Sequence, residues 1–398
     1  MAFCYTPTTF LIICSIIFST CTSSDNQGIP EDIRQLPDLH IIDPDDEPIS
    51  EIELTRKQSF TDTDEVLIGR PGDLTADEYG NVYIAEQSPN HPEIYSFDPD
   101  GNYITTIGSH GSGPGEFQSI SRIQYRDGYL YAYDGPLSRF SVFKNPYPNN
   151  QGDYSAATEL AHIIQPDTDD PSLPNEISES FLFPINFAVT GDHQILTAFK
   201  PFDSSIPSLF YVFIDQEGSI NTETILEIDS DEHVVDYSSG QMLLPTSRDA
   251  LVAISTDGDI FTSNSEEFLI KVYDRHGEYQ YALYKPYKRR ELDKDKLASE
   301  YESSRRRAIQ DAELPETWPA LDEVLMDDEN RLWIATLPDD PDMLEWWVLD
   351  ENSELLTRFD WPKYKEIKEI KNSSVFVRIA SHETGLTEVI QYDIEMEI

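Results

Sequence analysis

Short runs of alternating apolar and polar residues, separated by turn sequences, recur along most of the chain. The stretch from Leu74 to Phe117 holds runs rich in Val, Ile, Tyr and Phe, and glycine ends the turn sequences at 77–80 and 98–101. Runs bounded by Asp, Asn, Gly and Pro are typical of antiparallel strands joined by tight turns. The glycine-rich link 108–115 then leads onward. This stretch therefore predicts one four-stranded antiparallel unit.

The same pattern recurs to give six units in all. Later turn sequences lie at 126–128, 191–192, 215–218, 257–258, 274–277, 327–330 and 350–353. The sixth unit has only three predicted strands. Residues 50–60, ahead of the first unit, alternate between apolar and polar residues and predict one further strand. Pairing these two would close a ring and leave no open sheet edge. The predicted fold is therefore all-β: a six-bladed β-propeller of four-stranded antiparallel blades, closed by an N-terminal strand.

Two segments interrupt the repeat. Residues 146–180 are rich in Pro, Asp, Asn and Ser, which predicts long surface loops. Residues 288–313 contain no Gly or Pro and predict a helix with a thin apolar stripe. We thus expect the propeller to occupy residues 49–398, with one helical insertion at 288–313.

The N-terminus has the features of an export signal. Its apolar run, residues 10–18, is too short to span a bilayer but fits the core of a signal peptide. The following sequence, Phe-Ser-Thr-Cys, resembles a bacterial lipobox, in which Cys21 would become the lipidated first residue of the mature protein. An ordinary secretory signal cleaved nearby is the alternative. We expect residues 1–21 to be a signal peptide with a lipobox and residues 22–48 to be a flexible acidic tether.

The charge balance narrows the set of partners. The chain has 398 residues, with 75 acidic against 28 basic side chains and a net charge of -47. Such a surface repels nucleic acid and anionic membranes, so we expect no nucleic-acid partner and membrane attachment through the lipid anchor only. The acids serve solubility or, alternatively, attract cations. Their spread along the whole chain favours solubility.

The segment 108–117, GSHGSGPGEF, and the units that flank it resemble NHL-repeat propellers. More closely, they resemble the six-bladed propeller lipoproteins secreted by Gram-negative bacteria, over roughly residues 50–398. The resemblance implies an exported protein in the outer membrane or periplasm. It implies little about activity, because propellers host binding, hydrolysis and lyase chemistry alike. The enzymatic relatives that it implies are metal-dependent lyases and lactone or ester hydrolases, with metal ligands lining the central channel.

Three arginines are the first candidates for a binding site. Arg70, Arg122 and Arg248 each lie near the start of an inner strand, in three different units of an acidic protein. Guanidinium groups gathered at the mouth of a channel would suit a carboxylate or other anionic ligand. The alternative is that they neutralise neighbouring acidic side chains within the ring.

Oxygen ligands in equivalent positions suggest a second kind of site. A set consisting of Asp73, Asn186, Asp249 and Asp322 would favour Ca²⁺ over Zn²⁺. The eight histidines do not occupy equivalent positions in different units, and the chain has no nucleophile elbow or phosphate loop.

The functional hypothesis is therefore a non-enzymatic module without a cofactor that binds a small anionic ligand or a protein partner at the cell surface. The alternative is a Ca²⁺-dependent lyase or lactone or ester hydrolase with its site in the central channel.

Overall fold

The computed structural model describes residues 29–43, 46–60, 62, 66–145, 158–183, 187–203, 205–380 and 387–397. The chain divides into two compact units, Met1–Gln35 and Leu36–Ile398. In the first unit, the described residues form one short helix, α1 (Glu31–Arg34). The Arg34 side chain donates a hydrogen bond to the carbonyl of Ile29 at 2.9 Å, next to the start of this helix.

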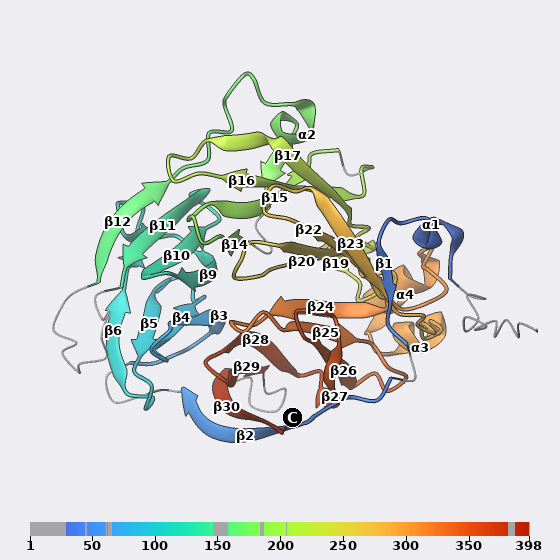
Figure 1. Ribbon diagram of the computed structural model, residues 1–398. Helices are drawn as coiled ribbons and strands as arrows, with labels where there is room; N and C mark the ends of the chain where they lie inside the picture. Colours follow the sequence, from blue (N-terminus) through green and yellow to red (C-terminus); the bar gives the residue numbers. More distant parts are fainter. Residues whose placement is uncertain are drawn as a thin grey trace, which may run out of the picture. The chain divides into compact units, whose positions relative to one another are not determined.

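The second unit is a six-bladed β-propeller built from antiparallel blades, as the sequence predicts (Figure 1). Three blades are regular four-stranded meanders. From the inside outward, their strands are β3 (Pro71–Ala76), β4 (Val82–Glu86), β5 (Ile94–Phe97) and β6 (Tyr103–Ile107) in blade one; β9 (Ile120–Arg126), β10 (Tyr129–Asp134), β11 (Arg139–Lys144) and β12 (Glu159–Ile164) in blade two; and β24 (Leu321–Met326), β25 (Leu332–Thr336), β26 (Met343–Leu349) and β27 (Leu355–Pro362) in blade five.

Blades three and four elaborate this plan. In blade three, two short strands pair with successive parts of β15, and in blade four a fifth strand, β1, adds in parallel outside β23. Their strands are β13 (Ser180–Leu182), β14 (Ala188–Val189), β15 (Ile195–Pro201), β16 (Ser208–Ile214) and β17 (Ile220–Asp229) in blade three, and β20 (Leu251–Ile254), β21 (Ile260–Ser263), β22 (Leu269–Tyr273), β23 (Tyr279–Tyr284) and β1 (Leu39–Ile41) in blade four. A two-stranded parallel sheet, β7 (Ser109–His110) with β8 (Glu116–Phe117), lies in the link between blades one and two.

Blade six contains the ring closure. It consists of β28 (Lys365–Lys371), β29 (Ser374–Ala380), β30 (Thr387–Glu397) and, outermost, β2 (Glu51–Phe60). β2 pairs antiparallel with β30 from Glu51–Glu397 to Phe60–Val389. The prediction that the strand at 50–60 completes the sixth unit is confirmed. The pairing removes an exposed edge from each strand, which is the physical reason for joining the two ends of the propeller.

Tight turns connect the strands through the Asp side chains that the sequence pattern singles out. The Asp98 carboxylate accepts the backbone N–H groups of Asp100 at 3.0 Å and Asn102 at 2.8 Å. Gly101 of the same turn has a φ of 82°, a conformation that favours glycine. Asp215, Asp274 and Asp350 accept the corresponding pairs of N–H groups in later blades. Turn chemistry thus sets the strand boundaries locally.

The expected flexible tether is wrong where it reaches the propeller. β1 pairs in parallel with β23, and Ile42 is buried in an apolar cluster formed with residues of blades four and five. The open edge of β23 offers backbone hydrogen bonds to any extended segment, and an apolar side chain fixes this one in place. The acidic composition of the segment does not reveal either interaction. Residues 22–28 lie outside the described residues.

The expected single helix at 288–313 is also wrong. Two short helices, α3 (Lys294–Ser299) and α4 (Ser303–Asp311), form there instead. Leu297 and Ile309 are both buried in one cluster with Val235 of the hairpin β18 (Val234–Tyr237) and β19 (Gly240–Leu243). One continuous helix could not bring its widely spaced apolar residues into a single cluster, so the chain folds back.

The surface loop expected at 146–180 needs correction as well. Residues 159–164 form β12, the outer strand of blade two, because their apolar positions complete the packing of that sheet. A short helix, α2 (Asn175–Ser178), follows in the same segment. Residues 146–157 lie outside the described part of the chain.

Candidate functional site

A cavity lies where the inner strands of all six blades meet. Its volume is about 170 Å³, and β3, β9, β14, β20, β24 and β28 each contribute lining residues. The polar and charged residues that line it are Asp73, Arg122, Gln124, Arg126, Glu323, Lys368 and Glu369. We call this space the central cavity. Its lining residues lie up to almost 300 positions apart in the sequence, so they come together only when the ring of blades is closed.

Strand alternation explains why charged side chains point into the cavity. On β9, Ile123 and Tyr125 are buried in the apolar core, although Ile123 also borders the cavity, and the polar residues Arg122, Gln124 and Arg126 line it. Successive residues of a strand point to opposite sides, so every second residue of β9 lies on the cavity side. Sequence reasoning selected Arg122 from its place near the start of the strand. The same alternation, continued along β9, would have identified Gln124 and Arg126.

On β28 the alternation is interrupted. The pairing with β29 shifts register between Ile367 and Glu369, and Ile367 and Ile370 are buried. As a result, the consecutive residues Lys368 and Glu369 both line the cavity. A bulge places an extra residue opposite its partner strand and changes the direction of the side chains that follow. The pattern of apolar and polar residues in β28 does not predict this bulge.

Arg122 and Asp73 form an ion pair across blades one and two. Arg122 Nη1 lies 3.2 Å from Asp73 Oδ1, and Asp73 Oδ2 accepts the backbone N–H of Ile123 at 2.9 Å. The Arg122 side chain is 31% exposed and the Asp73 side chain 9%. The structure therefore brings together one residue predicted to bind an anion and one predicted to bind a metal. The second uses both of its oxygens within the protein.

The other cations near the cavity also have protein partners. Arg126 donates to the carbonyl of Thr256 at 2.9 Å, and its Nε lies 3.3 Å from the Asp127 carboxylate. Lys368 Nζ lies 2.9 Å from Glu366 Oε2. These contacts fix the direction of the long basic side chains, which reduces the entropy lost when a ligand binds.

Two carboxyl groups in the cavity, those of Glu323 and Glu369, have raised pKa values. Burial raises the pKa of Glu323 to about 7, a shift that Lys368 opposes and Asp322 reinforces. Burial likewise raises the pKa of Glu369 to about 7, with Lys371 opposing the shift and Asp73 reinforcing it. Both groups thus change charge close to neutral pH.

A second cavity of about 360 Å³ adjoins the first. The two share Gln124, Arg126, Ile254, Met326 and Glu369 as lining residues. The second cavity is also lined by residues of the turns that follow the inner strands, and it includes Lys371, whose Nζ donates to the carbonyl of Ala76 at 2.9 Å. Four cationic side chains therefore line the two adjoining spaces: Arg122, Arg126, Lys368 and Lys371.

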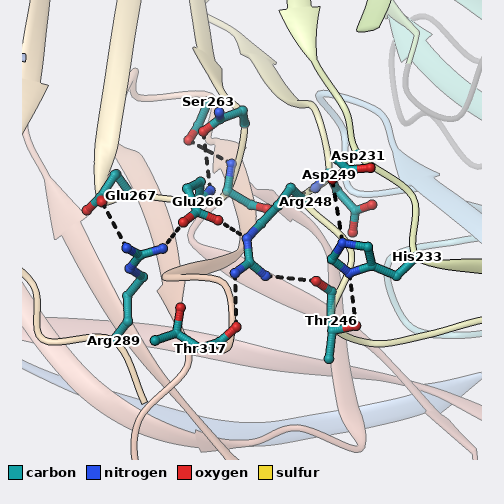
Figure 2. Close-up of polar contacts among 12 residues, drawn as sticks. Asp231, His233, Thr246, Arg248, Asp249, Ser263, Glu266, Glu267, Arg289 and Thr317 are labelled. Carbon is teal, nitrogen blue, oxygen red and sulfur yellow. Dashed lines mark hydrogen bonds and ion pairs between the residues drawn. The ribbon is translucent and has the colours of Figure 1, made fainter. Parts of the chain in front are cut away.

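Arg248 lies in a different environment (Figure 2). It is 7% exposed and donates to the carbonyls of Thr246 at 2.8 Å and Thr317 at 2.9 Å. Its Nε also pairs with the Glu266 carboxylate, which Arg289 contacts from the other side. Arg248 thereby ties its own loop to the loop after β21 and to the loop before β24. It is not among the described residues that line the central cavity.

Arg70 is exposed, and its backbone N–H donates to the Glu86 carboxylate at 2.9 Å. It does not belong to the described lining of the central cavity either. The structure therefore brings only Arg122, of the three predicted arginines, to this cavity.

The residues predicted to bind a metal are also distributed. Asp322 accepts a hydrogen bond from Lys363 Nζ at 2.6 Å. Burial, followed by the charges of Glu232 and Asp322, raises the pKa of Asp249. Asn186 lies outside the described residues. Within the described part of the chain, no group of three or more His, Cys, Asp or Glu side chains is placed to hold a metal ion.

Comparison with a family model supports the fold. The model of a family described as "6-bladed beta-propeller" matches residues 60–144, and no curated protein matches the chain. Among solved structures, the PQQ-bound aldose sugar dehydrogenase of Streptomyces coelicolor is 9% identical, with 88% of this chain and 100% of that chain covered and a TM-score of 0.45. A predicted exported protein from Bacteroides fragilis is 12% identical, with 90% and 99% covered and a TM-score of 0.48.

Virginiamycin B lyase of Staphylococcus aureus is 12% identical, with 85% of this chain and 88% of that chain covered and a TM-score of 0.40. At such identities and TM-scores, these similarities give no information about activity. In the described residues no helix has the length and apolar character needed to cross a membrane. The chain is a six-bladed β-propeller, and the family match covers blade one and the first three strands of blade two.

Proposed function

We propose that the protein is an exported β-propeller that binds a small anionic ligand in its central cavity. The observation that carries this proposal is the gathering of Arg122, Arg126, Lys368 and Lys371 around the channel of a chain whose net charge is -47. Charges in a narrow, partly dehydrated space interact more strongly than charges on the surface. The same two cavities are also lined by seven acidic residues, so the cationic groups lie in a channel of mixed charge: Asp73, Glu78, Asp127, Glu323, Asp327, Asp328 and Glu369.

The size of the cavity limits the ligand. A volume of about 170 Å³ lies below the range of about 300–1,000 Å³ typical of sites for drug-sized molecules. A guanidinium group presents N–H donors in a planar fork that matches a carboxylate. Small carboxylates therefore fit the site in both volume and chemistry, with Arg122 as the main contact.

Calorimetric titration with formate, acetate, propionate and succinate tests the proposal. Because charge-assisted hydrogen bonds contribute about 1.5–3 kcal/mol, the substitution R122Q should weaken binding at least about tenfold. The exposed Arg70 offers a matched control, since R70Q removes the same charge outside the cavity and should leave binding unchanged. Equal loss in both variants, or full affinity in R122Q, would contradict a site at Arg122.

We propose further that the protein is a lipoprotein of the NHL-like type, anchored in the outer membrane or facing the periplasm through a lipid on Cys21. The support is the signal-like apolar run at 10–18 and the cysteine that follows it. Mass spectrometry of the native N-terminus should find a mature chain that starts at a lipidated Cys21. An unmodified peptide that runs through Cys21 would show that this anchor does not exist.

A protein partner is a second candidate, because blade three exposes an aromatic patch. Phe181 is 40% and Phe202 69% exposed, their ring centroids are 5.7 Å apart, and Phe202 lines a cavity of about 580 Å³. Exposed apolar patches of this kind mark protein interaction sites. Glu176 and Glu179 also line that cavity, so the matching partner presents an apolar side chain flanked by basic residues.

This candidate is tested with a short peptide that has a central Phe between lysines, compared with its glutamate-flanked analogue. The lysine peptide should bind, and F202S should weaken its binding. Binding of both peptides with equal affinity, or binding that F202S does not change, would exclude the patch as their site.

The metal-dependent lyase or hydrolase stays a prediction. The carboxyl groups of Glu323 and Glu369, each with a pKa of about 7, favour an enzymatic role. A general acid or base works best when its pKa is near the working pH. In this alternative, Ca²⁺ would be held by Asp73, Asn186, Asp249 and Asp322. Metal content of the purified protein decides it, together with thermal unfolding in the presence and absence of EDTA. A stoichiometric ion whose removal lowers the Tm would support the metal site, because specific binding stabilises the native state.

A further inference from the structure

The cavity beside the aromatic patch of blade three has a largely apolar wall. Its volume of about 580 Å³ lies within the range of about 300–1,000 Å³ typical of sites that enclose a ligand. Pro201, Phe202, Ile206 and Phe210 form the apolar part of its lining. Phe202 is 69% and Ile206 43% exposed, so a partner can reach this surface directly. A group that enters the cavity therefore needs an apolar portion.

Three carboxylates line the same cavity, those of Glu176, Glu179 and Asp203. In the described part of the chain, the carboxylates of Glu176 and Glu179 have no ion-pair or hydrogen-bond partner. The hydroxyl and the backbone N–H of Ser205 donate to Asp203 at 2.7 and 2.9 Å, and these bonds lower the pKa of Asp203. All three groups carry a negative charge at neutral pH.

The described lining of this cavity contains no basic residue that would offset these charges. Lys200 immediately precedes the lining residue Pro201 on β15. Its ammonium lies 2.5 Å from the Glu232 carboxylate and 4.7 Å from the centre of the Phe183 ring, so its charge is already balanced. The cavity thus combines an apolar surface with uncompensated negative charge.

Hydrogen bonds hold the two sides of the cavity together. The backbone N–H of Phe202 donates to the carbonyl of Glu179 at 3.0 Å, which joins the loop after β15 to the end of α2. The hydroxyl of Ser180 donates to the carbonyl of Glu176 at 2.7 Å. These bonds fix the walls before a partner binds, which lowers the entropic cost of binding.

We propose that this cavity binds a long basic side chain of a protein partner, while an aromatic residue beside it packs against the exposed rings of Phe181 and Phe202. This inference rests on the protein-partner candidate and names the group that enters the cavity. Lysine, the model for such a side chain, has an apolar stem and a terminal ammonium with three N–H donors. The stem lies along Phe202 and Ile206, and the ammonium reaches Glu176 and Glu179. Its charge also interacts favourably with the faces of aromatic rings.

Calorimetric titration with three versions of the peptide that has a central Phe between two lysines tests this inference. Norleucine in place of both lysines keeps the apolar stem and removes the charge. Diaminobutyrate in both places keeps the charge and shortens the stem by two carbons. The lysine peptide should bind at least about fivefold more tightly than either analogue, because both parts of its side chain contribute. Added salt should weaken the binding of the lysine peptide more than that of the norleucine peptide.

Variants of the chain locate the charge that the lysines contact. E176Q/E179Q should lower the affinity for the lysine peptide at least about threefold and leave the affinity for the norleucine peptide unchanged. E217Q/E223Q is the matched control, because it removes the same charge from two exposed residues of blade three that do not line this cavity. The control should keep the preference for lysine. All four substituted residues are exposed, so both variants should retain the Tm of the unmodified chain.

The outcomes distinguish this inference from the candidate on which it rests. If none of the peptides binds, both the aromatic patch and the basic-side-chain site are wrong. If the lysine and norleucine peptides bind equally and F202S weakens both, the patch stands and this inference is wrong. Equal binding of the diaminobutyrate peptide would show that the stem does not enter the cavity. A preference for lysine that E176Q/E179Q leaves unchanged would assign the charge to other residues, and either of these results would overturn the inference.

Discussion

Replacement of Glu323 by glutamine should stabilise the protein at alkaline pH and leave its stability unchanged at acidic pH. The fold disfavours the ionised form of this carboxyl, since burial raises its pKa from 4.5 to about 7. Its contribution to stability is therefore fully present below about pH 4.5 and is lost as the pH rises through about 7. A glutamine side chain at this position carries no charge at any pH, so the variant avoids this loss.

The size of the effect follows from the pKa shift. A rise of the pKa from 4.5 to about 7 corresponds to about 3 kcal/mol, since each pKa unit is worth 1.36 kcal/mol. Solvent reaches part of the side chain and reduces the penalty, so we expect a gain of about 1–3 kcal/mol in the free energy of unfolding at pH 8.5. E369Q should behave in the same way, because its pKa is raised to a similar value.

Urea unfolding at pH 5 and pH 8.5, followed by tryptophan fluorescence, measures the difference between variant and unmodified chain. Taking this difference removes the general effect of the large negative charge, which acts on both proteins. E51Q controls for the loss of one acidic side chain and should show no pH-dependent gain. A difference for E323Q that is equal at both pH values, or that becomes unfavourable at pH 8.5, would refute the reasoning.

The remaining predictions concern the parts that hold the site in place. R248M should lower the free energy of unfolding by about 3 kcal/mol in urea titrations, because it removes a buried guanidinium that pairs with Glu266 and donates to the carbonyls of Thr246 and Thr317; a loss below about 1 kcal/mol would show that Arg248 does not hold these loops together. G108A should destabilise the chain by at least about 1 kcal/mol, since Gly108 has a φ of 81° and a new Cβ would lie 2.4 Å from the Phe117 ring; an unchanged Tm would count against this. Deletion of residues 1–61 should prevent cooperative folding, since it removes β2 from blade six; a sharp thermal transition in the truncated chain would contradict the role of the closing strand.

Local rules explain how much of the fold the sequence reveals. Alternation and Asp-containing turns act within a few residues, so the strands, the six units and the partner of the strand at 50–60 could be inferred directly. The helical insertion and the segment at 39–43 could not, because both depend on apolar residues that meet only in the folded chain, such as Leu297 with Ile309. Composition alone does not contain that information.

The site was only partly predictable for the same reason. The rule that residues near the starts of inner strands face the channel identified Asp73 and Arg122, which do line it. It also selected Arg248, which precedes β20 and is instead buried beside Glu266. The rule missed Lys368 and Glu369 because a bulge in β28 alters the alternation. Backbone irregularities of this kind arise from packing between blades, beyond the reach of a local pattern.

The most direct test of the anion site is a crystal structure of the protein soaked in bromide, whose anomalous signal locates each bound anion. Our account predicts a bromide ion in the central cavity within contact distance of Arg122. Bromide found only on the outer surface of the blades, with none in the central cavity, would contradict the account.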